Sequence, residues 1–460
     1  MERPNAWKEY TEENLKLVRE IGEEYRGMIS RNKTEREWTN EIVRRLEEAG
    51  YISLQTAILE NRVLKAGDKV YETRMGKAVL AFYLGQEPLE KGMNIVGAHI
   101  DSPRLDLKQN PLYEDTDLAY ADTHYYGGIK KYQWVARPLA LHGVVVRKDG
   151  STVELVIGEK DEDPVVGISD LLIHLSHEQM EKKLAEGISG ENLDVILAGQ
   201  PLDGKEKDAV REMVLHLLKE SYGLEEEDFI SAEIEVVPAG PARDFGLDRS
   251  MILGYGHDDR VCSSAELKAL EGLKETPRTT VCGMFVDKEE IGSVGATGMR
   301  ANYLENAVAE ILNLTGEYSE LKVRRALQNS RMLSCDVSAG YDPLYASVFE
   351  KKNSAFLGRG VCFNKYTGSR GKSGSNDANA EFMGKLRSIM DRNGIRWQTA
   401  ELGKVDAGGG GTIAYICALY GMEVIDSGVA VLSMHAPAEI ISKADLYEAV
   451  MAYRAFMLEA

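Results

Sequence analysis

Apolar positions recur with helical spacing at the start of the chain. The segments "WKEYTEENLKLVREIGEEYRGMIS" and "TEREWTNEIVRRLEEAG" place apolar residues every three or four positions, and the second ends at a glycine. This spacing predicts two helices. Three strand-like runs follow, "KVYETRM", "KAVLAFYLG" and "MNIVGAHI". The last is continuously apolar, which is typical of a strand buried on both faces in a parallel sheet.

Strand and helix patterns alternate again from residue 250 onward. This alternation predicts an α/β sheet, and the stretch that ends at residue 101 shows the same kind of strand and helix patterns. Apolar runs predict strands at 279–286, 331–337 and 422–433. Amphipathic patterns predict helices at 260–274, 298–313, 376–393, 408–420 and 442–459.

The middle of the chain has a different character. "YQWVARPLALHGVVVRKDGSTVELVIG" predicts a hairpin that turns at Asp149-Gly150, and "LLIHLSHEQMEKKLAEG" and "EKDAVREMVLHLLKESYG" predict helices. A chain of 460 residues is too long for one compact core. We therefore predict a catalytic α/β domain formed by residues 1–104 and 246–460, interrupted by an inserted domain at 105–245.

The composition narrows the range of partners and the location. Lys and Arg number 55 against 74 Asp and Glu, and the formal net charge of -19 argues against nucleic acid or an anionic membrane as a partner. No apolar stretch approaches the length of a membrane span, and the polar start "MERPNAWKEYTEEN" is unlike a leader peptide. Five scattered cysteines without a CxxC pair favour a reduced, cytoplasmic location.

Histidine and acidic side chains gather where the predicted strands end, the edge of an α/β sheet at which functional groups collect. Each alone is commonly a turn former, a helix cap or a structural histidine. Together they suit a pair of zinc-like ions held by nitrogen and oxygen ligands. The candidates are His99 and Asp101 in "VGAHIDSPRL", His257, Asp258 and Asp259 in "GYGHDDRVCSS", Asp287, Glu289 and Glu290 in "FVDKEEIGS", Asp336 in "MLSCDVSAGYDP", and His435 in "VLSMHAP".

The adjacent glutamates Glu289 and Glu290 are the most informative of these. Two neighbouring carboxylates are costly to bury unless a cation compensates them, and a solvated turn is the alternative. If two cations are bound, Glu290 can ligate one while Glu289, turned the other way, serves as the base in a hydrolysis. Asp101 could fix the tautomer of a metal-bound His99.

Four motifs, in this order, resemble the aspartyl aminopeptidase and vacuolar aminopeptidase I family: "GAHIDSPRL", "DKEEIGSVGATG", "LSCDVSAGYDP" and "SMHAP". The resemblance covers nearly the whole chain. It implies a three-layer α/β catalytic domain of the zinc-peptidase type and an inserted, mixed β-rich dimerisation domain. It also implies a metal-dependent aminopeptidase that removes single residues from the free N-terminus of peptides.

Carried over residue by residue, the resemblance implies a role for each candidate. Asp258 bridges two divalent ions, His99 and Asp336 complete one site, and Glu290 and His435 complete the other. Glu289 is the general base on the water between the ions, and Asp101 orients His99. Asp259 lies beside the bridging ligand, and the register favours Asp258. The expected ion is zinc, and cobalt or manganese would suit the same ligands.

The resemblance extends to partners and substrates. His174 matches a histidine that family members project into a neighbouring subunit's active site, and the alternative is a packing residue on a helix face. Dimers that assemble into a dodecamer are implied, and an acidic first residue is the expected preference, with Arg370 or Lys372 as candidate contacts. The run Gly408–Gly411 could let a peptide backbone approach closely. Two alternatives stay open. One is a dizinc carboxypeptidase or N-deacylase, and the other is a non-catalytic oligomeric scaffold with a structural metal cluster.

Overall fold

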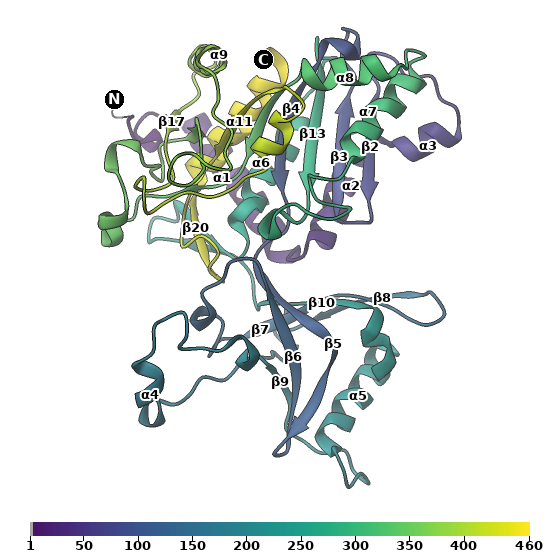
Figure 1. Ribbon diagram of the computed structural model, residues 1–460, viewed down its shortest axis with the longest axis vertical. Helices are drawn as coiled ribbons and strands as arrows, with labels where there is room; N and C mark the ends of the chain where they lie inside the picture. Colours follow the sequence, from purple (N-terminus) through teal and green to yellow (C-terminus); the bar gives the residue numbers. More distant parts are fainter. Residues whose placement is uncertain (1–2) are drawn as a thin grey trace. The chain divides into compact units, whose positions relative to one another are not determined.

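The computed structural model describes residues 3–460 and divides the chain into two compact units (Figure 1). The first unit contains the residues up to Asp101 together with Ala242–Met434 and Glu439–Ala460. The second contains Ser102–Pro241 and His435–Ala438. The predicted domain boundaries and the dimerising role of residues 105–245 stay predictions.

A nine-stranded sheet forms the centre of the first unit. Its strands lie in the order β1-β2-β3-β13-β4-β14-β18-β16-β17, and β13, β4, β14 and β18 are parallel neighbours. The carboxyl ends of these four strands therefore meet at one edge. The strands are β1 (Ile52–Ser53), β2 (Lys69–Arg74), β3 (Ala78–Tyr83), β4 (Met93–His99), β13 (Thr280–Val286), β14 (Arg331–Cys335), β16 (Val361–Asn364), β17 (Trp397–Thr399) and β18 (Glu423–Gly428).

Helices cover both faces of this sheet. Val96 and Ala98 of β4 pack in one apolar core with α1, α2, α6, α9 and α11, whereas Met93 and Ile95 pack in a second core with α3, α7, α8 and α10. The predicted three-layer α/β class is confirmed. The helices are α1 (Glu12–Arg31), α2 (Glu35–Glu48), α3 (Leu54–Leu59), α6 (His257–Glu271), α7 (Tyr303–Leu314), α8 (Glu320–Gln328), α9 (Ala380–Arg392), α10 (Ala414–Ala418) and α11 (Lys443–Glu459). Within residues 3–460, no helix is both long enough and apolar enough to cross a membrane.

A smaller five-stranded sheet completes the first unit. Its order is β11-β12-β20-β19-β15, and it is antiparallel except where β15 pairs with β19. The strands are β11 (Arg243–Phe245), β12 (Met251–Gly254), β15 (Ser338–Ala339), β19 (Ala430–Leu432) and β20 (Glu439–Ser442). The 3₁₀ turns of this unit are η1 (Ala6–Lys8), η2 (Leu89–Lys91), η7 (Glu289–Ile291), η8 (Pro343–Val348) and η9 (Lys351–Asn353).

The second unit is built on a six-stranded antiparallel sheet in the order β8-β7-β10-β5-β6-β9. The predicted hairpin forms from β7 and β8, and Gly150 in its turn has a φ of 84°. The strands are β5 (Arg104–Asp115), β6 (Leu118–Tyr126), β7 (Leu139–Val146), β8 (Thr152–Ile157), β9 (Val195–Ala198) and β10 (Ala232–Pro238). The helical elements are η3 (Lys131–Gln133), η4 (Ile173–Leu175), α4 (His177–Met180), η5 (Gly190–Asn192), α5 (Ala209–Tyr222) and η6 (Glu226–Ser231).

Two predicted helices are largely wrong. The pattern at 171–187 forms only η4 and the four-residue α4, because its apolar side chains are exposed and gain no stabilising packing. The helix expected at 408–420 is reduced to α10, since four consecutive glycines disfavour helix at its start.

Candidate metal centre

The end of β4 places His99 and Asp101 in a buried position of the first unit. His99 Nδ1 lies 3.0 Å from the Asp101 carbonyl oxygen and 3.3 Å from its Oδ1. A proton on Nδ1 would leave the lone pair of Nε2 directed at Asp258 Oδ1, 3.1 Å away, with Asp336 Oδ1 at 3.9 Å. Asp101 thus lies where it can fix the imidazole orientation.

The pKa of His99 shows how strongly this site attracts positive charge. Burial opposes a charge on the ring, but hydrogen bonds to Asp101 and Asp258, with the charge of Asp336, raise the pKa well above its ordinary value. The carboxylates that favour a proton on Nε2 would equally favour a cation there.

The start of α6 carries Asp258 and Asp259, both buried. The backbone N–H of Asp258 donates to Glu439 Oε2 at 3.1 Å, and its carboxylate faces His99. Asp259 does not join His99 and Asp336 in the cluster of potential ligand atoms. Burial raises the pKa of Asp259 well above its ordinary value.

The segment after β13 carries the two glutamates. Both backbone amides donate to one carboxylate, Glu289 N–H to Asp101 Oδ1 and Glu290 N–H to Asp101 Oδ2, each at 3.2 Å. A carboxylate oxygen of Glu290 lies within 4.8 Å of one of Asp258. The adjacent glutamates are therefore held against the end of β4 by the residue that also contacts His99.

Asp287 begins the same loop and forms hydrogen bonds to Thr297 near the end of that loop. Its backbone N–H donates to the Thr297 carbonyl oxygen at 3.3 Å, and its Oδ2 accepts from Thr297 Oγ1 at 2.5 Å. Gly292 and Gly295 have φ values of 91° and 126°, a region that few side chains tolerate. The glycines thus permit the turn that carries the glutamates.

Asp336 follows β14 directly, and its backbone N–H donates to the Ser427 carbonyl oxygen at 2.8 Å. Burial, and then the nearby Asp258 carboxylate, raise the pKa of Asp336 well above its ordinary value. The neighbouring carboxylates repel one another unless a proton or a cation lies among them.

His99, Asp258 and Asp336 form one group whose potential ligand atoms all lie within 4.8 Å of one another. One imidazole nitrogen with carboxylate oxygens is a donor set that zinc accepts. Burial and the neighbouring Asp258 carboxylate raise the pKa of Asp336, and a divalent cation would offset both effects. These residues therefore fit a bound metal ion.

The predicted residues His435 and His174 belong to the second unit. His435 Nδ1 lies 2.9 Å from the Gly128 carbonyl oxygen. His174 is exposed within η4. Their roles as a ligand and as a subunit-bridging residue stay predictions.

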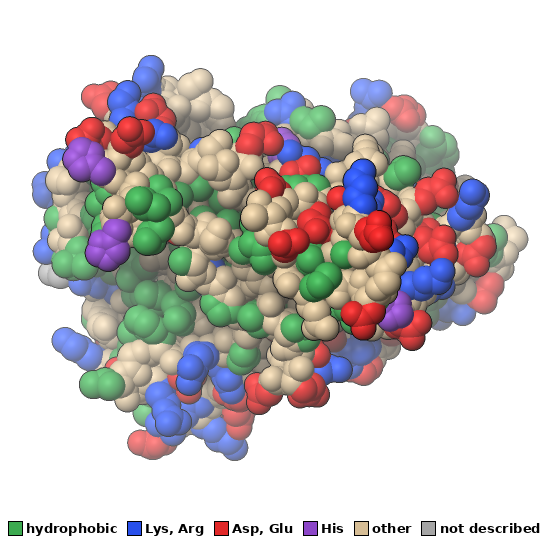
Figure 2. All heavy atoms as spheres, turned by 90° about the horizontal axis from the view of Figure 1, so that it is seen from below, with side chains coloured by type: hydrophobic (Ala, Val, Ile, Leu, Met, Phe, Trp, Pro, Cys, Tyr) green, Lys and Arg blue, Asp and Glu red, His purple; other side chains and the backbone are tan. Residues whose placement is uncertain are grey.

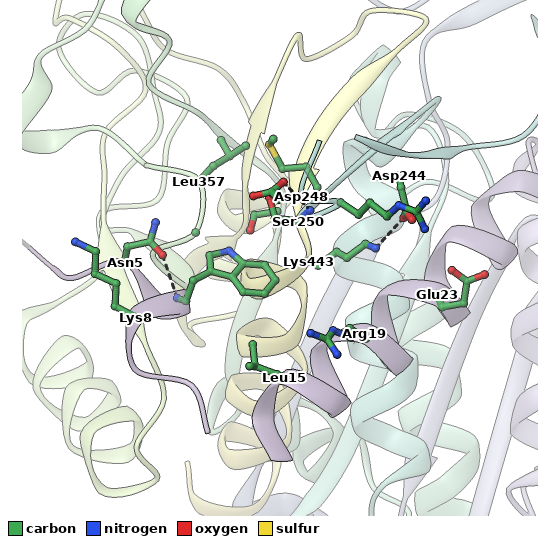
Figure 3. Close-up of a pocket in the computed structure, with 15 residues that line it drawn as sticks. Asn5, Lys8, Leu15, Arg19, Glu23, Asp244, Asp248, Ser250, Leu357 and Lys443 are labelled. Carbon is green, nitrogen blue, oxygen red and sulfur yellow. Dashed lines mark hydrogen bonds and ion pairs between the residues drawn. The ribbon is translucent and has the colours of Figure 1, made fainter. Parts of the chain in front are cut away.

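Arg370 and Lys372 line a hollow of about 340 Å³ in the first unit, together with Lys404 and Gly408. Lys372 is paired with Asp377, with Nζ to Oδ2 at 3.0 Å. A larger hollow of about 870 Å³ is lined by Asn5, Lys8, Leu15, Arg19 and Asp248 among others (Figure 3). It includes none of the predicted site residues.

Two residues near the centre were not among the predicted site residues. Glu439 of β20 is buried and accepts the Asp258 amide, and Arg260 of α6 is buried and donates to the Ile100 carbonyl oxygen. A charged residue inside an apolar pattern, as in "AEIIS", was the available hint for Glu439.

Comparison with known proteins places the chain among peptidases. The profile of a family described as aminopeptidase I zinc metalloprotease (M18) matches residues 28–457. A probable M18 family aminopeptidase 1 of Clostridium acetobutylicum is 56% identical over 457 residues, 99% of this chain and 98% of that protein. The crystal structure of an M18 family aminopeptidase from Thermotoga maritima is 46% identical with a TM-score of 0.95 and covers 100% of both chains. The S. cerevisiae mApe1 dodecamer structure is 21% identical with a TM-score of 0.76, over 95% of this chain and 96% of that chain, and shows the shared fold alone.

Proposed function

The chain belongs to the M18 family of aminopeptidase I zinc metalloproteases, and from this premise we propose that it removes single residues, acidic ones by preference, from peptides with the help of two metal ions. The observation that carries the proposal is the shared anchoring of the two glutamates by Asp101, next to the cluster of His99, Asp258 and Asp336. That arrangement combines a candidate ligand set with a candidate base.

His99, Asp258 and Asp336 would hold one ion, and Asp258, Glu290 and His435 would hold the other. Both sets contain one histidine with carboxylates, which suits zinc, and cobalt or manganese would also be accepted. Zinc bound there would supply Lewis-acid polarisation of the scissile carbonyl and would lower the pKa of a water molecule.

Glu289 would act as the general base. The hydrogen bond from its backbone N–H to Asp101 fixes its backbone, so that its side chain can serve proton transfer while Glu290 serves binding. It would take a proton from the attacking water and deliver it to the leaving amine. Asp101 would keep His99 in one orientation through the reaction.

The hollow lined by Arg370 would bind the side chain of the substrate's first residue. Lys372 is already paired with Asp377, so Arg370 and Lys404 are the better candidates to bind a substrate carboxylate. Gly408 lines the same hollow, but a Cβ on Gly408 would meet Leu402 and one on Gly409 would meet Ser369, so contacts within this chain explain both glycines.

We expect the protein to be active as an oligomer. The second unit exposes large apolar side chains around His174, a composition typical of a protein interface: Leu172, Ile173, Leu175, Met180 and Leu184. Figure 2 shows hydrophobic side chains in groups among charged ones on one face of the molecule. The yeast protein of similar fold forms a dodecamer. We expect this chain to form dimers that assemble further, with His174 contributing to a neighbour's site.

The test is hydrolysis of a panel of unblocked aminoacyl-anilides and short peptides. The protein is stripped of metal by a chelator and then refilled with zinc, cobalt or manganese. Metal-dependent release of one N-terminal residue, fastest for Asp and Glu, is expected, and N-acetylated peptides should be inert. Cleavage of acetylated substrates alone would instead support a carboxypeptidase or deacylase, and no turnover with metal bound would support a scaffold.

A further inference from the structure

Arg260 is a fully buried arginine that follows the Asp258-Asp259 pair directly. Its Nε donates to the Ile100 carbonyl oxygen at 3.2 Å, and its Nη2 donates to the Lys33 carbonyl oxygen at 2.7 Å. The guanidinium thus joins the start of α6 to the end of β4 and to the turn between α1 and α2.

Ile100 is the residue between His99 and Asp101. Its N–H donates to the Val286 carbonyl oxygen at 2.9 Å, at the end of β13, and its carbonyl oxygen accepts from Arg260. The peptide groups of Ile100 are therefore fixed on both sides. Because His99 and Asp101 flank this residue, their orientation depends on those two hydrogen bonds.

Burying the side chain of Arg260 at this position costs free energy. Removing a guanidinium from water is unfavourable unless its hydrogen-bond donors find acceptors in the protein. Its hydrogen bonds go to neutral carbonyl oxygens, and the rings of Trp38 and Tyr255 lie 6.0 and 5.4 Å from the guanidinium carbon. An apolar side chain could fill the space, but it would leave the Ile100 carbonyl without this donor.

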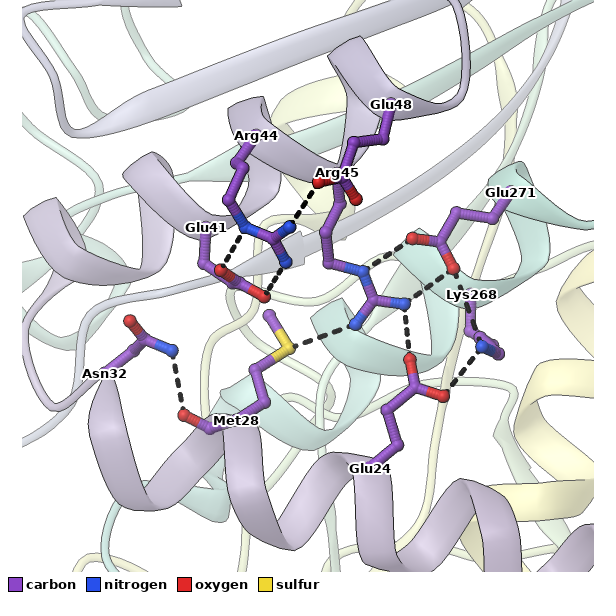
Figure 4. A network of polar contacts seen from close by, with 9 residues as sticks. All are labelled: Glu24, Met28, Asn32, Glu41, Arg44, Arg45, Glu48, Lys268 and Glu271. Carbon is purple, nitrogen blue, oxygen red and sulfur yellow. Dashed lines mark hydrogen bonds and ion pairs between the residues drawn. The ribbon is translucent and has the colours of Figure 1, made fainter.

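Arg45 of α2 offers a contrast within the same unit. It is also largely buried, and it binds the carboxylates of Glu24 and Glu271, which joins α1, α2 and α6 (Figure 4). These are ion pairs between helices, and Arg45 makes no bond to the segment that carries His99. Its loss should affect stability alone.

We propose that Arg260 is a positioning residue of the metal centre, which sets His99 and Asp101 against Asp258 by holding the Ile100 carbonyl. The proposal rests on the proposed function, because it takes His99 and Asp258 as ligands. It assigns to Arg260 an effect on metal binding that is separable from its contribution to folding.

The test compares Arg260→Met and Arg260→Lys with the matched control Arg45→Met. Zinc affinity is measured by competition with a chelator, the visible spectrum is recorded after loading with cobalt, and the melting temperature is measured without metal. Loss of a residue that orients metal ligands typically weakens metal binding by about 10- to 100-fold. Arg260→Met should show such a loss of zinc affinity and an altered cobalt spectrum. Arg260→Lys keeps the charge but not both hydrogen bonds, so its loss of zinc affinity should be smaller.

Arg45→Met should lower the melting temperature without changing zinc affinity or the cobalt spectrum. The proposal is overturned if both Arg260 variants bind zinc like the parent, or if metal affinity falls equally in the Arg45 variant. If Arg260→Met does not fold, Arg260→Lys decides between these results. Failure of the parent protein to bind metal would instead overturn the proposed function.

Discussion

The backbone amide of Glu289 donates to Oδ1 of Asp101 at 3.2 Å, although the two residues are 188 positions apart in the chain. The second oxygen of the same carboxylate accepts the amide of Glu290. One buried side chain therefore sets the position of the candidate base, of a candidate ligand and of His99.

Replacing Glu289 by Gln should remove the base while leaving the metal. We expect turnover to fall by at least about 10²-fold, the usual contribution of general base catalysis, with unchanged metal content by elemental analysis. Glu290→Gln is the control, and it should lower metal content as well as turnover. Near-normal turnover of the Glu289 variant would exclude its role as the base.

Replacing Asp101 by Asn should disturb the site without removing a ligand. An amide side chain has one acceptor oxygen, so one of the two backbone N–H groups would face an NH₂ group. We expect metal affinity or kcat/KM to fall by about 10- to 100-fold. Asp68→Asn, which changes an exposed carboxylate that also accepts a backbone N–H, should leave both unchanged. Equal behaviour of the two variants would contradict the positioning role.

Asp445 of α11 should make stability depend on pH. Burial raises its pKa to about 8, although the amides of Gly358 and Gly360 oppose the shift. The folded state then holds a proton that the unfolded chain releases near pH 4, so the free energy of unfolding should fall as pH rises from about 4 to about 8.

The Asp445→Asn variant tests this slope by chemical unfolding of metal-free protein at several pH values. The variant should be less stable than the parent near pH 4, because its NH₂ group faces a backbone N–H. Its stability should nevertheless fall less steeply between about pH 4 and 8 than that of the parent. Parallel curves for the two proteins would show that Asp445 does not titrate in this range.

The cysteines should be unreactive in the folded protein. All five are buried, and burial raises the pKa of Cys362 and of Cys417 to about 12, so that almost no thiolate exists at pH 8. A thiol reagent should label none of them until denaturant is added, and then all five. Rapid labelling without denaturant would contradict the buried positions.

The sequence was most informative where apolar runs end in charged residues. His99 and Asp336 could be proposed together because the parallel strands β4 and β14 bring their carboxyl ends to one edge. Asp258 instead follows β12 of the smaller sheet, so its place beside them depends on the folded chain. The hairpin of β5 and β6 went unrecognised, since its turn uses Thr116 and Asp117 at positive φ in place of the usual glycine.

Other features depend on contacts that no local pattern encodes. Arg260 and Glu439 act through hydrogen bonds to distant segments, and their burial is decided by the folded chain. At 171–187 a local pattern exists without such contacts. The amphipathic pattern predicts a helix there, but its apolar residues are exposed within this chain. Amphipathic periodicity alone does not provide the packing that stabilises a helix.

The position of β4 between β13 and β14, with a separate apolar core on each face, has a consequence for how the site is assembled. Backbone amides in such a strand exchange with solvent only when much of the protein opens. His99 and Asp336 directly end or follow strands of this kind. The fold therefore fixes the backbone positions of these two candidate ligands, and we expect metal to bind after the strands have formed.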